Sequence, residues 1–107
     1  MKAIVLHKNG GPEQLRYEDI ETPKPGPGEV LIRVRAAGVN HVDIDIRKGA
    51  SGMAGNFPHI PGVDAAGVIA EVGEGVTGWE EGDRVAPHFI LNCGVCTNCV
   101  RGAENIC

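Results

Sequence analysis

All four cysteines of the chain lie near its end, at Cys93, Cys96, Cys99 and Cys107. Their spacing, C-x2-C-x2-C-x7-C, lets neighbouring thiolates reach one ion from a tight turn, and Gly94 makes such a turn easier. Four sulfur ligands are a set that tetrahedral zinc prefers in structural sites. Because four thiolates fill the tetrahedron, we expect the segment 92–107 to be a closed structural zinc lobe with no open position for water or substrate.

Two other arrangements of the same thiols compete with zinc. The cysteines can pair as disulfides in any of three connectivities, or the first C-x2-C can be a redox couple. Disulfides are typical of secreted proteins, and the first apolar run, Ala3 to Leu6, is far too short for a signal peptide. A redox C-x2-C normally opens a helix after a strand, whereas here a third cysteine follows at once and no helical period does. Structural zinc is therefore the favoured interpretation.

Length and composition limit what the chain can be. Its 107 residues suffice for one domain with a modest core, so a separate nucleotide-binding half is expected to be absent. Sixteen glycines and seven prolines indicate many turns and short strands. The formal charge of -4 argues against a nucleic-acid partner, and no apolar run is long enough to span a membrane. A cytoplasmic protein is the default expectation.

The apolar pattern predicts a mainly β domain. Apolar and polar residues alternate most clearly from 29 to 37, which is the period of a strand. Small residues at 65–67 would permit close backbone approach within a buried strand. We expect a small barrel, closed or nearly closed, with the metal lobe at one end. The predicted strands are 2–7, 14–20, 29–37, 65–72 and 85–91, the first two forming a hairpin, and a short helix is expected at 42–48 with Gly49 as its C-cap.

Several short motifs in order resemble a known family. They are Gly26-x-Gly28-Glu29, Ala37-Gly38-Val39-Asn40, Pro61-Gly62-Val63-Asp64-x-x-Gly67, Gly82-Asp83-Arg84-Val85 and the four-cysteine lobe. Together they resemble the N-terminal part of the medium-chain dehydrogenases and reductases, which include zinc alcohol dehydrogenases and quinone oxidoreductases. The resemblance implies a GroES-like, partly open β-barrel over residues 1–107. In that family a Rossmann domain that binds NAD or NADP follows, and we expect it to be missing from this chain.

Two positions depart from the zinc alcohol dehydrogenase pattern. Those enzymes carry catalytic-zinc ligands as a cysteine where this chain has Asn40 and as a histidine where it has Val63. An amide is a poor zinc ligand and valine is none, so we expect no catalytic zinc. The run from Asn40 through Asp43 and Arg47 to Gly49 instead resembles quinone oxidoreductases. The resemblance implies a fragment of an NAD(P)-dependent oxidoreductase acting on carbonyl, enone or quinone substrates, inactive alone; the alternative is a zinc-stabilised binding module without activity.

Asn40, His41 and Asp43 are the candidate site residues away from the cysteines. Asn40 is expected to line the nicotinamide and substrate cleft and to donate to a substrate carbonyl, or else to be a turn residue. His41 stands where relatives present a basic residue to the cofactor's pyrophosphate, or it is an exposed loop histidine. Asp43 is expected to orient one of these two residues or to cap a helix.

The remaining polar candidates have plainer expected roles. Asp64 is predicted to make a salt bridge or turn contact. His59 is expected to be a solvated loop residue, with the rim of the cleft as the alternative, and His88 to be a packed strand residue in preference to a spare ligand. Because the family's barrel is completed by chain beyond the nucleotide domain, the resemblance also implies an exposed strand edge and possible homo-oligomers.

Overall fold

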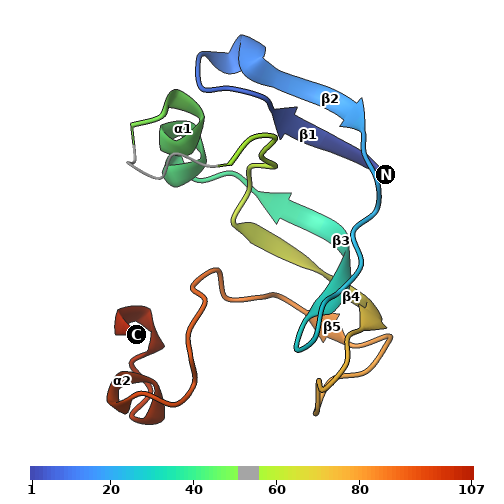
Figure 1. The fold of residues 1–107 in the computed structure, drawn as a ribbon, viewed down its shortest axis with the longest axis vertical. Helices are drawn as coiled ribbons and strands as arrows, with labels where there is room; N and C mark the ends of the chain where they lie inside the picture. Colours follow the sequence, from blue (N-terminus) through green and yellow to red (C-terminus); the bar gives the residue numbers. More distant parts are fainter. Residues whose placement is uncertain (51–55) are drawn as a thin grey trace.

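The computed structural model describes residues 1–50 and 56–107 as a mainly β domain with two short α-helices (Figure 1). None of its helices in those ranges is long and apolar enough to cross a membrane. The elements are β1 (Lys2–Leu6), β2 (Leu15–Asp19), β3 (Val30–Gly38), α1 (His41–Lys48), β4 (Asp64–Val72), β5 (Arg84–Val85) and α2 (Thr97–Val100), with single 3-10 turns at Pro12–Gln14 and Glu104–Ile106.

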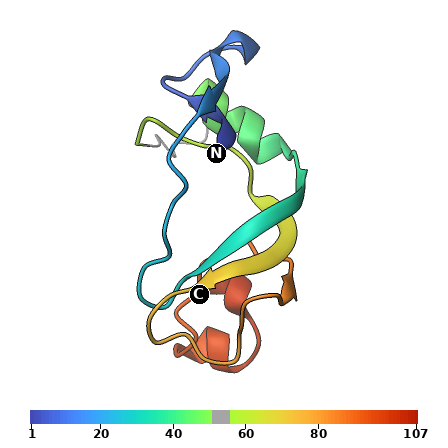
Figure 2. The ribbon, with the colours of Figure 1, turned by 90° about the vertical axis from the view of Figure 1, so that its right-hand side faces the viewer.

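The strands form two separate sheets in the described ranges. β1 and β2 make the predicted antiparallel hairpin, with Ile4 opposite Tyr17. The second sheet has the order β3-β4-β5, and Gly38 at the end of β3 pairs with Asp64 at the start of β4. Of the expected forms, closed or nearly closed, full closure is not found in the described ranges, and the partly open GroES-like fold is confirmed (Figures 1 and 2).

The hairpin is attached to the rest of the domain through backbone hydrogen bonds. The N–H groups of Leu6 and His59 each donate to the other residue's carbonyl at 2.8 Å. Leu6, Val5 and Ile69 are the most deeply buried large side chains. His59 is half-buried in this bridge, so the expectation of a solvated loop histidine is wrong. A β-bridge at this point fixes the proline-bounded loop against β1.

The close approach predicted around residues 65–67 is found at Gly67. A Cβ atom at Gly67 would lie 2.3 Å from the backbone oxygen of Arg33 on the neighbouring strand β3. Most of β4 is only half-buried, however, and Ile69 is its one fully buried residue, so the prediction of a buried strand is wrong in extent.

The predicted strand 85–91 is wrong beyond Val85. β5 is limited to Arg84–Val85, which pair with Val68 and Gly67 of β4. Pro87 has no N–H to donate to a sheet ladder, and proline within a run is a signal against a strand. His88 is exposed beside Phe89, with 5.3 Å between the ring centroids, and is not the packed strand residue that was expected.

Candidate functional site

The four cysteines converge in the lobe that ends the chain. Their sulfur atoms all lie within 4.8 Å of one another. The Sγ separations are 3.5 Å for Cys96 and Cys99, 3.7 Å for Cys93 and Cys107, and 3.9 Å for Cys93 and Cys99. At a Zn–S distance of about 2.3 Å, the edge of an S4 tetrahedron is about 3.8 Å. The sulfur cluster therefore has the size that a zinc ion requires.

All four cysteines are free in the structure. A disulfide needs an S–S distance of about 2.05 Å, well below these separations. The lobe also contains a helix that the sequence did not predict, since α2 begins directly after Cys96. The Asn98 side chain on α2 donates to the Ile106 carbonyl at 2.7 Å, which fastens the helix to the segment that carries Cys107.

The lobe gives its thiols different acidities. Backbone N–H groups of Val95 and Cys96 donate to the Cys93 sulfur and lower the pKa of that thiol to about 6. The same kind of backbone contact, from Cys99, lowers the pKa of Cys96. Burial is the main reason that the pKa of Cys99 is raised to about 11. Thiolates bind zinc, so Cys93 is the sulfur best prepared to meet the ion first.

A second group of polar residues joins three segments around the start of α1. The Asp43 carboxylate accepts from the backbone N–H of Asn40 at 2.7 Å and from that of Gly62 at 3.0 Å. The Asn40 side-chain amide donates through Nδ2 to Asp64 Oδ2, also at 2.7 Å. Asp43 is buried, with 7% of its surface exposed, and its two acceptor contacts satisfy both carboxylate oxygens. These contacts tie the end of β3 to α1 and to the segment entering β4.

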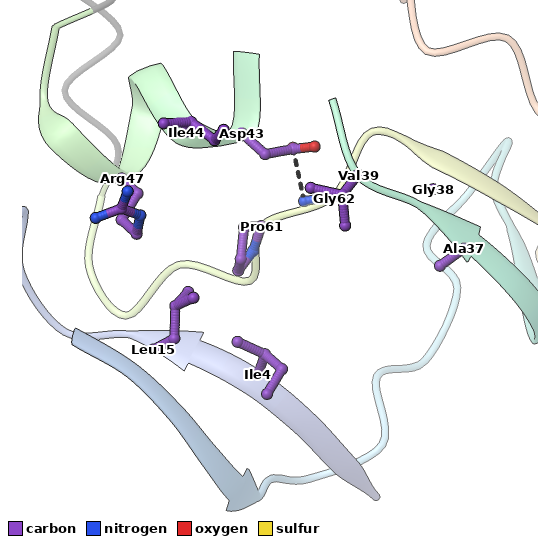
Figure 3. A pocket seen from close by; sticks show the side chains of 10 residues that line it. All are labelled: Ile4, Leu15, Ala37, Gly38, Val39, Asp43, Ile44, Arg47, Pro61 and Gly62. Atoms are coloured by element: carbon purple, nitrogen blue, oxygen red, sulfur yellow. Dashed lines mark hydrogen bonds between the residues drawn. The ribbon is translucent and has the colours of Figure 1, made fainter. Parts of the chain in front are cut away.

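A mostly apolar cavity of about 320 Å³ lies between the hairpin, α1 and this polar group (Figure 3). The Asp43 carboxylate in its wall is turned to Gly62, as Figure 3 shows. The buried Arg47 donates to the Gly10 carbonyl at 2.6 Å. Apolar side chains therefore dominate what a ligand would meet. The lining residues are Ile4, Leu15, Ala37, Gly38, Val39, Asp43, Ile44, Arg47, Pro61 and Gly62.

A second hollow of about 420 Å³ lies over the paired ends of β3 and β4. Its wall consists of alanine, glycine and proline residues with one charged side chain, that of Asp64. The Asn40 backbone N–H donates to Asp43, which lines the first cavity. The Asn40 side-chain amide donates to Asp64, which lines the second hollow. Asn40 thus links the two hollows.

The structure brings together some of the predicted site residues and separates others. Asn40 and Asp43 are adjacent, and Asp43 orients the Asn40 backbone as part of the helix cap. Asp64 contacts the Asn40 amide, whereas a salt bridge or turn contact was expected. His41 is exposed at the first residue of α1, and its imidazole makes no hydrogen bond to another residue within 1–50 and 56–107.

Sequence reasoning missed the part played by Arg47 and Gly62. Each contacts a partner distant in the sequence, Gly10 for Arg47 and Asp43 for Gly62. The available signal was the position of Arg47 four residues after Asp43, which puts both on one helix face. In the described ranges, the four cysteines are the only cluster of three or more His, Cys, Asp or Glu residues with metal-ligand spacing.

Comparison with known proteins finds the same domain in dehydrogenases and reductases. Residues 26–107 match the family model described as the alcohol dehydrogenase GroES-like domain. An alcohol dehydrogenase of Moraxella sp. is 42% identical over 108 residues, covering 100% of this chain and 31% of the relative.

Two solved structures are similar along most of the chain. A cobalt and zinc bound thermostable alcohol dehydrogenase from Pyrobaculum aerophilum has 45% identity and a TM-score of 0.88, covering 100% of this chain and 32% of that protein. A quinone oxidoreductase of Escherichia coli complexed with NADPH has 35% identity and a TM-score of 0.75, covering 80% of this chain and 26% of that protein. The chain thus spans about a third or less of the length of these relatives.

Proposed function

Because this chain belongs to the alcohol dehydrogenase GroES-like domain family of the medium-chain dehydrogenases and reductases, we propose that it is the catalytic-domain portion of an NAD(P)-dependent oxidoreductase. Its substrates are carbonyl, enone or quinone compounds, and its single zinc is structural. The nicotinamide supplies hydride when bound. The chain's own task is then to hold the substrate oxygen and exclude water from the reacting atoms.

The observation that supports this proposal most directly is the kind of metal-ligating atoms available near Asn40. Where zinc alcohol dehydrogenases have a cysteine and a histidine, this chain has Asn40, whose amide nitrogen faces Asp64 at 2.7 Å, and Val63, which has no donor atom. Zinc in a catalytic site needs three protein ligands. A lone carboxylate beside an amide does not meet that need, which favours reduction without a catalytic metal.

The cysteine lobe supports a purely structural role for zinc. Cys93, Cys96, Cys99 and Cys107 would supply all four ligands, and their sulfur separations suit one tetrahedral ion. Few apolar side chains of the lobe are buried; Val95 and Val100 are 81% and 75% exposed. The ion would therefore replace the hydrophobic core that the lobe lacks.

Asn40 and His41 are the residues that we assign to the cofactor and substrate. Asn40 is half-buried beside apolar hollows, where an amide donor to a carbonyl oxygen is stronger than in water. His41 is exposed, and an imidazole N–H there would be able to donate to the pyrophosphate of NAD(P). Asp43 is assigned a positioning role, because its carboxylate accepts from the Asn40 backbone N–H.

Fusing this chain to the remaining part of the Moraxella alcohol dehydrogenase would test the proposal. We expect NADPH or NADH oxidation with enones or quinones, no alcohol-dependent NAD(P)+ reduction, and one zinc per chain by native mass spectrometry. The matched variant Asn40→Cys with Val63→His restores the two missing donors and should bind a second zinc. A second zinc in the unaltered fusion, or turnover of simple alcohols alone, would contradict a metal-free cleft.

The alternative is a zinc-stabilised binding module without activity. It predicts the same zinc content, because the cysteine lobe is common to both proposals. It differs in predicting that the fusion protein, although folded and able to bind NADPH, turns over no enone, quinone or carbonyl compound. If the fusion protein binds the cofactor but turns over none of these compounds, the binding module would be favoured.

A further inference from the structure

Asp64 fixes the orientation of the Asn40 side-chain amide. The distance from Asn40 Nδ2 to Asp64 Oδ2 is 2.7 Å. A carboxylate oxygen can only accept a hydrogen bond, so the nitrogen of the amide, and not its oxygen, must face Asp64. A hydrogen bond to a charged acceptor is stronger than one between neutral groups. An asparagine amide can adopt two orientations, or flips, that exchange its nitrogen and oxygen. The contact with Asp64 therefore selects one of these two orientations for Asn40.

The backbone holds both members of this pair in place. The β3–β4 ladder sets Asp64 directly opposite Gly38, two residues before Asn40. A Cβ atom at Gly38 would lie 3.2 Å from Asp64 Cβ and 3.3 Å from Oδ2, tighter than ordinary contact, so glycine leaves room for the carboxylate. Asp43 holds the Asn40 backbone N–H from the other side. The contact thus follows from strand register and a helix cap.

An amide nitrogen carries two hydrogens, and Asp64 takes only one of them. We propose that Asp64 is a positioning residue, which aims the second Nδ2 hydrogen of Asn40 at an acceptor oxygen of the ligand. This inference rests on the proposed function, in which Asn40 contacts the substrate. A donor whose direction is already set does not reorganise as negative charge develops on the oxygen that it binds. The ligand group selected is a carbonyl oxygen, as in an enone, a quinone or a ketone.

The substitution Asp64→Asn would remove the contribution of Asp64 to this selection with little change in shape. The amide that it introduces can accept from the Asn40 nitrogen or donate to the Asn40 oxygen, so position 64 no longer excludes either orientation, and only the capping-box contact of the Asn40 side chain with the Asp43 backbone N–H still favours one. Asp64→Glu keeps the carboxylate and should keep the selection. Because Asp64 is exposed, Asp64→Asn leaves no buried group without a partner, and the fold should be retained.

A double-mutant cycle in the fusion protein tests the coupling. Asn40→Ala should lower kcat for enone reduction by about tenfold or more, and Asp64→Asn by about tenfold with KM for NADPH unchanged. In the Asn40→Ala background, Asp64→Asn should change kcat by less than about twofold, because no amide remains to be oriented. Asp64→Glu should recover most of the loss, and Asp45→Asn on α1 is the matched control outside the site.

The outcomes distinguish a failure of the positioning role from a failure of the proposed function. Equal effects of Asp64→Asn with and without Asn40, or no effect in either background, would overturn the positioning role while leaving the proposed function intact. No loss with Asn40→Ala would remove Asn40 from the reaction and overturn the positioning role, whereas the proposed function fails only if the unaltered fusion reduces no enone, quinone or carbonyl compound. In the unfused chain, NMR should show the Asn40 Nδ2 hydrogen that faces Asp64 shifted downfield, and Asp64→Asn should abolish the shift.

Discussion

The unequal thiols of the cysteine lobe have a measurable consequence for metal binding. Backbone donors lower the pKa of Cys93 to about 6, whereas burial raises the pKa of Cys99 to about 11. Zinc binds thiolates, so each thiol that is still protonated must release a proton on binding. At a pH well above the pKa of Cys93, this thiol is already ionised and releases no proton when zinc binds. Below that pKa it contributes a proton, and zinc affinity falls more steeply as the pH is lowered.

We therefore expect zinc to displace fewer than four protons at slightly alkaline pH and close to four under mildly acidic conditions. Calorimetric titration in buffers of different ionisation enthalpy measures this number directly. Release of four protons under both conditions would show that Cys93 is not acidified in the metal-free lobe.

Asp43 is expected to contribute to stability independently of any ligand. Asp43→Ala removes the acceptor for the Asn40 and Gly62 N–H groups and should lower the free energy of unfolding by about 2 kcal/mol. Asp45→Ala, two residues along the same helix, is the control and should cost much less. Urea unfolding of both variants with zinc bound measures the difference. Equal stabilities would mean that water satisfies these N–H groups as well as the carboxylate does.

The same residues show where sequence reasoning succeeded and where it stopped. The cysteine cluster was predictable because its spacing is local and the chemistry of sulfur ligands is specific. The contact between Asn40 and Asp64 was not, because it depends on the β3–β4 register. A slip of one residue would turn Asp64 to the other face of the sheet.

At the scale of elements, the strand pattern was informative only where a partner strand exists. Ile32, Val34 and Ala36 alternate with the two arginines at 33 and 35 in β3, which pairs along its length with β4. The apolar run after Val85 looks equally strand-like, but it contains Pro87 and has no ladder beyond β5 among the described residues. Phe89 and Leu91 there are 60% and 96% exposed. Local hydrophobicity does not reveal whether a neighbouring strand is available.

The β3–β4 pair also yields a prediction for Gly67. Gly67→Ala would place a Cβ atom 2.3 Å from the Arg33 carbonyl oxygen, and because backbone must move, we expect a loss of about 1–3 kcal/mol in stability. Gly26→Ala is the control, since its Cβ would meet only the flexible Glu29 carboxylate, at 3.2 Å. Thermal unfolding of both variants compares them. A Gly67→Ala variant as stable as Gly26→Ala would indicate that the strands separate without cost.

At the scale of the whole molecule, the cysteine lobe and the sheets are held by different forces. The lobe lies beyond the β3-β4-β5 sheet, away from the β1–β2 hairpin (Figure 1). Its backbone hydrogen bonds are internal, such as Val100 N–H to Cys96 O at 3.0 Å and Ala103 N–H to Asn98 O at 2.8 Å. The sheets depend on strand pairing and on a few deeply buried side chains, such as Leu6 and Ile69, which are 0% and 2% exposed.

Removing zinc should therefore unfold the lobe and leave the sheets in place. With a strong chelator, we expect hydrogen exchange at the amides of 96–107 to approach the rate of an unstructured peptide, while the β3 and β4 amides keep their protection. Cys107→Ser should produce much of the same loss in the presence of zinc, and Thr97→Ser, which changes no metal ligand, should not. Loss of protection in β3 and β4 at the same chelator concentration would instead mean that lobe and sheets unfold as one cooperative unit. Zinc would then stabilise the sheets that bring Asn40 and Asp64 together, and its removal would also disturb that pair.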